Sequence, residues 1–334
     1  MSASASSIVE MPALLKPLPK MGCGTWAWGN RLLWDYEPAM DADLQQAFNH
    51  CVSSGVTFFD SGDSYGTGKL SGQSEKLLGQ FSADYRGPNA DRICLATKLA
   101  PYPWRLTASS MVKAGEASAK RLGHLDLVQL HWSTANYLPL QEGFLLNGLA
   151  TLCSQGIASG LGVSNFGPKR LRLAHQRLSD RGIKIQTLQV QYSLLSTYPI
   201  TELGLKEVCD ELDIQIIAYS PLALGLLTGK YKRKEDLPKG LRKFALGQLL
   251  PNVRPLLDCL GAIAVEKEKT MAQVAINWCI CKGTLPIPGA KNLSQAQQNT
   301  GALGWSLSDS EVTELDNASA ACTKQAVQNI FQSR

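Results

Sequence analysis

Short apolar runs alternate with amphipathic stretches along this chain, from residue 20 to about residue 303. This alternation is typical of parallel β-strands joined by α-helices. No linker interrupts the pattern, so we predict a single α/β domain over residues 18–331. Residues 1–17 precede the pattern and are predicted to form a flexible N-terminal segment.

Eight of the apolar runs are predicted strands, and each is preceded or followed by a helical pattern. They are residues 21–25, 56–59, 93–97, 125–130, 161–163, 187–190, 214–218 and 284–287. Eight strand–helix units match a TIM (β/α)8 barrel, whose functional site lies at the C-terminal ends of the strands. A doubly wound parallel sheet is the structural alternative.

The clearest helix is predicted to begin after Asp41, which would act as its N-cap, and to end at Gly55. Its apolar residues recur at spacings of three and four and so share one face: Leu44, Ala47, Phe48, Cys51 and Val52. The strand at residues 56–59 follows directly.

The chain has 334 residues, 44% of them hydrophobic and 18% charged, so it can bury a large core. The longest apolar run, residues 216–227, contains Ser220, Pro221 and Gly225. It is shorter than the roughly 18 to 20 residues of a membrane helix, and we predict no transmembrane segment. Nine Cys without a C-x-x-C pair favour a reducing compartment over a disulfide framework or a zinc ribbon.

Lys and Arg exceed Asp and Glu by 33 − 28 = 5, a modest excess that predicts no nucleic-acid partner. The positive charges gather only in residues 230–243, which form either a solvated loop or a loop that faces phosphate. The oligomeric state leaves no signal in the sequence.

Ionisable residues follow three neighbouring predicted strands. Asp60 and Tyr65 follow the second strand, Lys98 ends the third, and His131 follows the fourth. Because parallel strands end at the same face of a barrel, we expect these four side chains to converge.

This combination suits the reduction of a carbonyl group. Hydride transfer leaves an alkoxide that needs a proton, and a tyrosine with an ordinary pKa of about 10 is a poor donor near neutral pH. We expect Lys98 to lower that pKa, Asp60 to hold the lysine and His131 to orient the carbonyl oxygen. No metal is required. Each residue alone also fits a cap, a loop anchor, a solvated lysine or a core histidine, so the prediction depends on all four.

The four residues resemble the catalytic tetrad of the aldo-keto reductase superfamily, and the similarity extends over roughly residues 18–331. It implies NADPH/NADP as cofactor. Contacts to the nicotinamide carboxamide are implied for Ser164, Asn165 and Gln191. Stacking on the nicotinamide and pyrophosphate binding are implied for Tyr219, Ser220, Pro221, Leu222, Gly225 and Lys230. Contacts to the adenosine 2′-phosphate and adenine are implied for Gly289, Lys291, Asn292, Gln295, Gln298 and Asn299. Further cofactor contacts are expected of Asp60 and, in the first strand and its loop, of Gly24, Thr25 and Trp26.

One residue departs from the family pattern. Gln295 stands four residues after Lys291, where many members have an Arg, and this weakens the expected preference for NADPH over NADH. Residues 22–27 also satisfy the G-x-G-x-x-A pattern of a Rossmann dinucleotide site. However, residues 26–30 are a poor helix start, so we favour a barrel strand and its loop.

Residues 24–30, 102–107, 129–134, 277–283 and 328–332 resemble the plastid pyridoxal reductases of plants and algae. The resemblance implies that a small aldehyde, pyridoxal, is reduced to pyridoxine. Trp28, Trp104 and Trp132 could wall a pocket for this flat ring, or could equally pack within a lid.

Two alternative functions stay open from the sequence. The protein could be a broad-specificity aldehyde and ketone reductase, or a regulatory subunit that binds NADPH and resembles the potassium-channel β subunits. The chloroplast stroma is implied by resemblance only, with the cytosol as the alternative. Residues 1–7 are rich in Ser and Ala and free of acidic residues, as in the remnant of a targeting segment or a disordered start.

Overall fold

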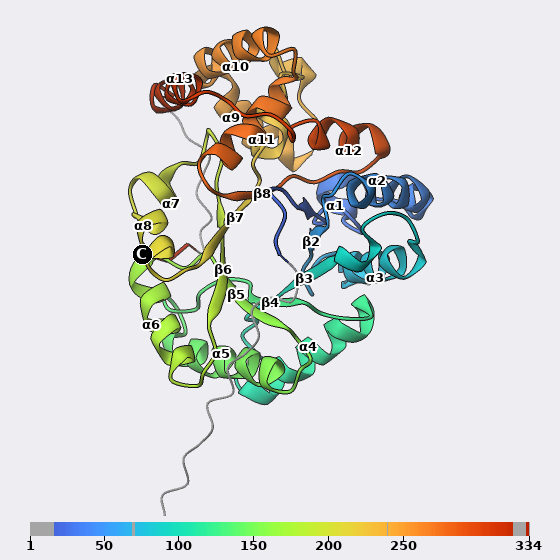
Figure 1. Cartoon of the computed structure of the whole chain (residues 1–334), viewed down its shortest axis with the longest axis vertical. Coiled ribbons are helices and arrows are strands. Elements are labelled where there is room, and N and C mark those ends of the chain that lie inside the picture. The colour runs from blue at the N-terminus through green and yellow to red at the C-terminus, as the bar shows by residue number, and fades with distance from the viewer. Residues whose placement is uncertain (1–16, 69–70, 239, 323–331, 334) are drawn as a thin grey trace, which may run out of the picture.

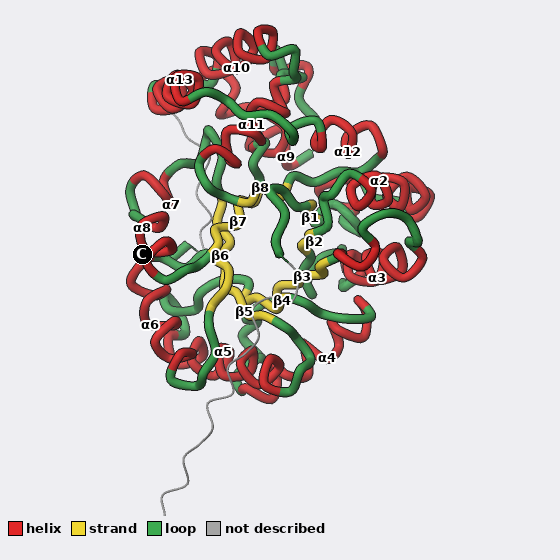
Figure 2. Tube along the Cα trace, viewed as in Figure 1, coloured by secondary structure: helices red, strands yellow, loops and turns green. Residues whose placement is uncertain are grey.

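A computed structural model describes residues 17–68, 71–238, 240–322 and 332–333. The predicted flexible segment therefore lies outside the described residues except for residue 17, as do residues 323–331 at the end of the predicted domain. Figures 1 and 2 show a ring of strands with helices around it.

Eight parallel strands form one sheet in the order of the sequence. They are β1 (Cys23–Gly24), β2 (Phe58–Asp60), β3 (Cys94–Leu99), β4 (Leu127–Leu130), β5 (Gly160–Ser164), β6 (Ile185–Gln191), β7 (Gln215–Tyr219) and β8 (Leu285–Ile287). The amides of Gly22 and Gly24 donate to the carbonyls of Pro286 and Pro288 at 3.0 and 3.2 Å, which joins the first strand to the last. The predicted barrel is confirmed, and the doubly wound alternative is excluded.

The helices surround the strands. They are α1 (Arg31–Trp34), α2 (Asp41–Ser53), α3 (Gln73–Asp84), α4 (Ala108–Leu122), α5 (Pro139–Ser154), α6 (Pro168–Ser179), α7 (Tyr198–Thr201), α8 (Leu205–Glu211), α9 (Leu241–Leu249), α10 (Arg254–Glu266), α11 (Met271–Cys281), α12 (Leu293–Thr300) and α13 (Asp309–Ala320). Among the described residues, no helix combines the length and the apolar character that crossing a membrane requires.

The predicted N-cap of α2 is wrong by one position. The short 3-10 turn Pro38–Met40 leads straight into the helix, so Asp41 is its first residue and Met40 precedes it. The Asp41 carboxylate instead accepts a hydrogen bond of 2.8 Å from the Tyr36 hydroxyl. Gly55 lies just beyond the helix with a φ of 84°, the left-handed conformation that favours glycine.

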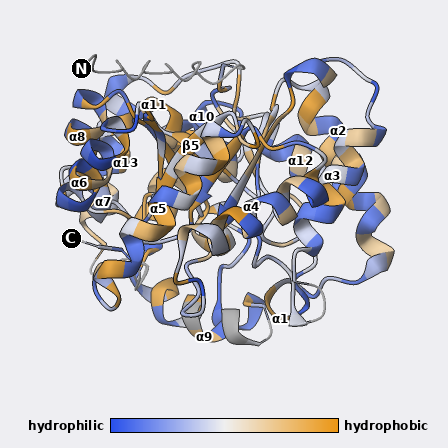
Figure 3. Ribbon diagram, turned by 90° about the horizontal axis from the view of Figure 1, so that it is seen from below, coloured by the Kyte–Doolittle hydropathy of each residue, from blue (hydrophilic) through white to orange (hydrophobic). Residues whose placement is uncertain are grey.

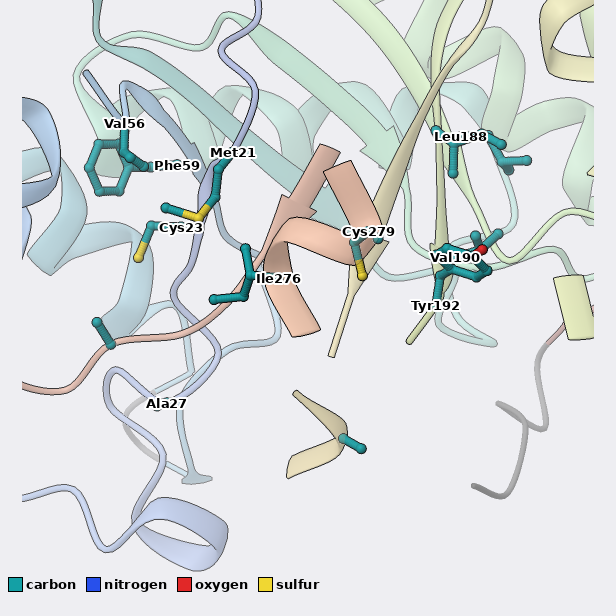
Figure 4. Close-up of a cluster of buried hydrophobic side chains, with 14 of the residues drawn as sticks. Met21, Cys23, Ala27, Val56, Phe59, Leu188, Val190, Tyr192, Ile276 and Cys279 are labelled. Atoms are coloured by element: carbon teal, nitrogen blue, oxygen red, sulfur yellow. The ribbon is translucent and has the colours of Figure 1, made fainter. Parts of the chain in front are cut away.

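Two apolar cores follow from the alternation of side chains along each strand. The larger core lies between the strands and the helices, and Figure 4 shows part of it, with side chains from β1, β2, β6 and α11. The smaller core fills the barrel interior with alternate strand residues: Phe58, Cys94, Ala96, Leu127, Ile217, Leu285 and Ile287.

The same alternation places a polar layer above the inner core. Two residues beyond Phe58 is Asp60, and two beyond Ala96 is Lys98; both polar side chains are buried. Gln129 follows Leu127 in the same way. The strand period thus changes the interior from apolar to charged at the C-terminal ends of the strands.

Candidate active site

A cavity of about 1420 Å³ opens at the C-terminal ends of the strands. Trp34 of α1 lines one part of it, and Leu246 and Leu249 of α9 line another. Figure 3 shows α1 and α9 at the same end of the barrel, along its lower edge. The four residues predicted to converge all line this cavity: Asp60, Tyr65, Lys98 and His131.

Asp60 and Lys98 form a fully bonded ion pair in the barrel interior. The Lys98 ammonium donates to one carboxylate oxygen of Asp60 and, at 2.7 Å, to the carbonyl of Ser61. The other oxygen of Asp60 accepts bonds of 2.9 Å from both Gln129 and Gln189. Burial lowers the pKa of Lys98, and the Asp60 charge opposes that shift. Because hydrogen bonds hold both side chains, Asp60 and Lys98 each have a fixed orientation.

The sequence interpretation missed Gln129 and Gln189 as supports of this pair. The strand period was the signal that pointed to them, because Gln129 faces inward on the same alternation as Leu127. Amide groups suit the position, since they donate hydrogen bonds to a carboxylate without adding charge.

Tyr65 lies in a loop that is tied to the end of β3. Its own amide donates to the carbonyl of Gly62 at 3.0 Å, and the amide of Asp63 donates to the carbonyl of Lys98 at 2.9 Å. The Asp63 carboxylate accepts 2.5 and 3.1 Å bonds from Arg105 and from the amide of Ala100. The loop is thus bonded to the strand that carries the lysine.

The Lys98 ammonium lies 4.9 Å from the centroid of the Tyr65 ring. Even so, burial raises the pKa of the Tyr65 hydroxyl well above its usual value, and the charges of Asp60 and Asp63 raise it further. This differs from the expectation that Lys98 would lower that pKa. The physical reason is burial, which disfavours the charged phenolate, and the two nearby carboxylates act in the same direction. Tyr65 therefore keeps its proton at neutral pH.

His131 completes the group from the end of β4. The centroids of its ring and the Tyr65 ring are 5.8 Å apart, with the planes at 71°. Burial and the nearby Lys98 charge hold the pKa of His131 well below 6.5, so the imidazole is neutral. Its buried Nδ1 has no hydrogen-bond partner within the described part of the chain. A neutral imidazole has one donor and one acceptor nitrogen for a small polar ligand.

Asn165 links the ends of three strands beside this group. It adopts a φ of 59°, which is uncommon for a residue with a side chain. Its amide nitrogen Nδ2 donates to the carbonyl of His131 at 3.2 Å and to the hydroxyl of Ser164 at 3.0 Å, and its Oδ1 accepts 3.0 Å from the Tyr219 hydroxyl. These residues and Gln191 line the cavity.

The loop after β7 forms another wall of the cavity. Ser220, Ala223, Leu224 and Gly225 all have positive φ values. This tight chain path brings backbone to the cavity surface, along with Pro221 and Leu222. Lys230, at the start of the basic stretch, also lines the cavity.

The turn after β8 carries a second cationic residue. Lys291 lines the cavity, and its ammonium donates to the carbonyl of Trp34 at 3.4 Å. Gln295 accepts 2.9 Å from the amide of Lys291, and Asn299 donates 3.2 Å to the carbonyl of Gly289. Side chains from α12 therefore brace the turn.

Most of the predicted cofactor residues line this one cavity. Besides those already described, they are Gly24, Thr25, Trp26, Gly289, Gln295, Gln298 and Asn299. Asn292 is outside the cavity lining. Its side chain accepts a 3.0 Å bond from the amide of Gln295 and so caps the N-terminus of α12.

The three tryptophans that could have walled a substrate pocket do not line this cavity. Trp28 is 0% exposed and donates 3.0 Å to the carbonyl of Ala290, so it belongs to the core. Trp104 is 71% exposed and stacks on Tyr102, with ring centroids 4.6 Å apart. Trp132 donates 2.6 Å to the hydroxyl of Tyr137. None of these three tryptophans is among the cavity residues.

Two other aromatic residues, Trp34 and Phe244, do line the cavity. The ring of Trp34 meets the ring of Trp26 edge-on, with centroids 5.8 Å apart. Phe244 comes from α9 and is 75% exposed. The sequence interpretation missed both, because they lie on helices inserted beyond the strand ends and no strand pattern leads to them.

The sequence and the fold are both similar to those of known proteins. The profile of the aldo/keto reductase family matches residues 20–320. This chain therefore belongs to the aldo/keto reductase family.

Three relatives illustrate the match. The chloroplastic pyridoxal reductase of Arabidopsis thaliana is 50% identical over 318 residues, covering 94% of this chain and 87% of the relative. An uncharacterised oxidoreductase of Mycobacterium tuberculosis is 33% identical over 315 residues, covering 90% of each chain. The crystal structure of an aldo/keto reductase from Klebsiella pneumoniae in complex with NADP and acetate has a TM-score of 0.70 and 26% identity, covering 94% of this chain and 95% of that one.

Proposed function

We propose that this protein reduces an aldehyde with NADPH, and that the aldehyde is pyridoxal, which becomes pyridoxine. The observation that carries the proposal is the protonated Tyr65 in the wall of a cavity that also presents Lys230 and Lys291. The substrate follows from the 50% identity to the Arabidopsis pyridoxal reductase over almost the whole chain.

The cavity fits a dinucleotide phosphate in size and in charge. Its volume of about 1420 Å³ exceeds the roughly 300 to 1,000 Å³ of a drug-sized pocket, which leaves room for a nucleotide and a substrate together. We assign Lys291 to the 2′-phosphate, Lys230 to the pyrophosphate and Asn165 to the nicotinamide carboxamide. A lysine ammonium suits a phosphate, and an amide suits an amide because it both donates and accepts.

The cofactor supplies a hydride to the carbonyl carbon when it is bound. The hydroxyl of Tyr65, which is protonated at neutral pH, delivers its proton to the carbonyl oxygen as negative charge develops there. Lys98 then stabilises the negative charge left on Tyr65, across the 4.9 Å from its ammonium to the ring. His131 is neutral and donates a hydrogen bond that orients the carbonyl oxygen.

The chloroplast stroma is the proposed location, by analogy with the chloroplastic Arabidopsis relative. A fluorescent fusion to the C-terminus of the full chain, viewed in plant cells, tests this. Signal confined to chloroplasts supports the stroma, and diffuse signal outside them favours the cytosol.

The function is tested by following NADPH absorbance with pyridoxal, pyridoxal phosphate and a panel of simple aldehydes. We expect the largest kcat/KM with pyridoxal and formation of pyridoxine. Similar rates across the panel would instead indicate a broad-specificity reductase. Tight NADPH binding without turnover of any aldehyde would favour a regulatory subunit.

A further inference from the structure

Ser333 makes two hydrogen bonds to the turn that carries Asn165, one of the residues that line the cavity. Ser333 is 1% exposed. Its amide donates 3.0 Å to the carbonyl of Asn165, and its hydroxyl oxygen accepts 2.9 Å from the amide of Gly167. The two bonds join positions that are 166 to 168 residues apart in the sequence, across the turn between β5 and α6.

One of the two bonds gives a partner to the amide of Gly167, which the turn itself does not supply. Gly167 is the N-cap of α6 and, having no side chain, makes no capping hydrogen bond. The first amides of a helix have no partner within the helix, and a buried amide without a partner is costly. Ser333 accepts from the amide of Gly167 and so acts as a cap supplied from the far end of the chain.

Asn165 has a left-handed backbone conformation that several hydrogen bonds surround. Its φ of 59° lies in the region that glycine and, among residues with a side chain, asparagine adopt most readily. Its amide donates 2.9 Å to the carbonyl of Gln189, and its side chain bonds to His131 and Tyr219. The carbonyl of Asn165 is the group that Ser333 holds.

We propose that Ser333 is a positioning residue that keeps Asn165 in the orientation required by the nicotinamide end of the cofactor. Ser333 is not among the cavity residues, so it acts only through the turn. This inference rests on the proposed role of Asn165 toward the carboxamide. It implies that the chain end contributes to cofactor affinity.

Ser333→Ala tests the inference, because it removes the hydroxyl and keeps the backbone amide. Loss of one hydrogen bond predicts about threefold to tenfold weaker NADPH binding, measured by fluorescence titration. Binding of 2′-phospho-ADP-ribose, which lacks nicotinamide, should stay unchanged. Ser333→Thr keeps the hydroxyl and should restore NADPH affinity. Removal of residues 332–334 deletes both bonds and should weaken NADPH binding further.

The outcomes separate this inference from the proposed function. Equal weakening of both ligands by Ser333→Ala, or no weakening of NADPH, overturns the positioning role. Failure of the unaltered protein to bind NADPH overturns the proposed function itself. Ser53→Ala is the matched control, since Ser53 is exposed on α2 and its hydroxyl donates to the nearby carbonyl of His50, at 3.0 Å. It should change neither affinity.

Discussion

The ammonium of Lys98 lies 4.9 Å from the centre of the Tyr65 ring, yet the pKa of Tyr65 is raised. Burial is the main cause, and the lysine charge is paired with Asp60. The tyrosine is therefore held as a phenol, ready to give up its proton only when negative charge develops on a bound oxygen. Lys98 serves chiefly to stabilise the phenolate that results.

Tyr65→Phe is predicted to abolish turnover while NADPH binding stays nearly intact. The change removes one hydroxyl, and loss of a general acid costs roughly 10²- to 10⁴-fold in rate. Steady-state NADPH oxidation measures turnover, and fluorescence titration measures binding. Tyr137→Phe, on a half-exposed residue outside the cavity, is the control. Wild-type turnover in Tyr65→Phe would exclude Tyr65 as the donor.

Lys291→Met is predicted to weaken NADPH much more than NADH. A hydrogen bond to a charged group contributes about 1.5 to 3 kcal/mol, or roughly tenfold to a hundredfold in affinity, and NADH has no 2′-phosphate to lose it. The KM values for the two cofactors provide the measurement. Lys230→Met is the matched comparison, because a pyrophosphate contact should weaken both cofactors alike. Equal losses from Lys291→Met would show that Lys291 does not contact the phosphate.

Protonation of His131 is predicted to destabilise the fold in acid. Its pKa is well below 6.5 in the folded chain, through burial and the Lys98 charge, so the unfolded chain binds the extra proton first. This contribution to stability is complete above pH 6.5 and is lost as the pH falls below it, by at most about 1.4 kcal/mol per pH unit.

Urea unfolding between pH 5 and 8 checks this prediction. The free energy of unfolding should fall less steeply with acid in His131→Gln than in the unaltered protein. Identical pH dependence in the two proteins would mean that His131 titrates normally in the folded state.

Trp28→Phe is predicted to destabilise the protein without changing the KM for the aldehyde. The change shrinks a fully buried side chain and leaves the carbonyl of Ala290 without its donor, at a cost of about 2 to 3 kcal/mol. Thermal unfolding measures the loss. Trp104→Phe, on the exposed stacked residue, should cost less than about 0.5 kcal/mol. A raised KM in Trp28→Phe would return this residue to the substrate pocket.

The local pattern was sufficient to predict the barrel and the four converging residues. All eight predicted strands are present, with ends shifted by up to two residues, because apolar runs reveal a strand more clearly than its limits. Asp60, Lys98 and His131 stand at or next to the ends of their strands, and Tyr65 comes five residues after Asp60, so the topology brings them to one face. The resemblance to a known family named most of the cavity residues.

The positions of three tryptophan side chains could not be predicted from the sequence. Trp28, Trp104 and Trp132 stand near strand ends, but loop conformation decides whether such a side chain enters the core, the cavity or the surface. Asn292 was expected at a phosphate, and the structure shows that its side chain caps α12, since an asparagine before a helix fits either role.

The sequence by itself determined the order of strands and helices, the period-two change from apolar to polar residues inside the barrel, and the convergence of the acid, lysine, tyrosine and histidine. These properties are local, because the spacing of residues along a strand sets the direction of each side chain. Only the tertiary structure decided the protonation of Tyr65, the walls of the cavity and the bond from Ser333 to the turn at Asn165. Burial and long-range hydrogen bonds depend on residues far apart in the chain, which no local pattern brings together.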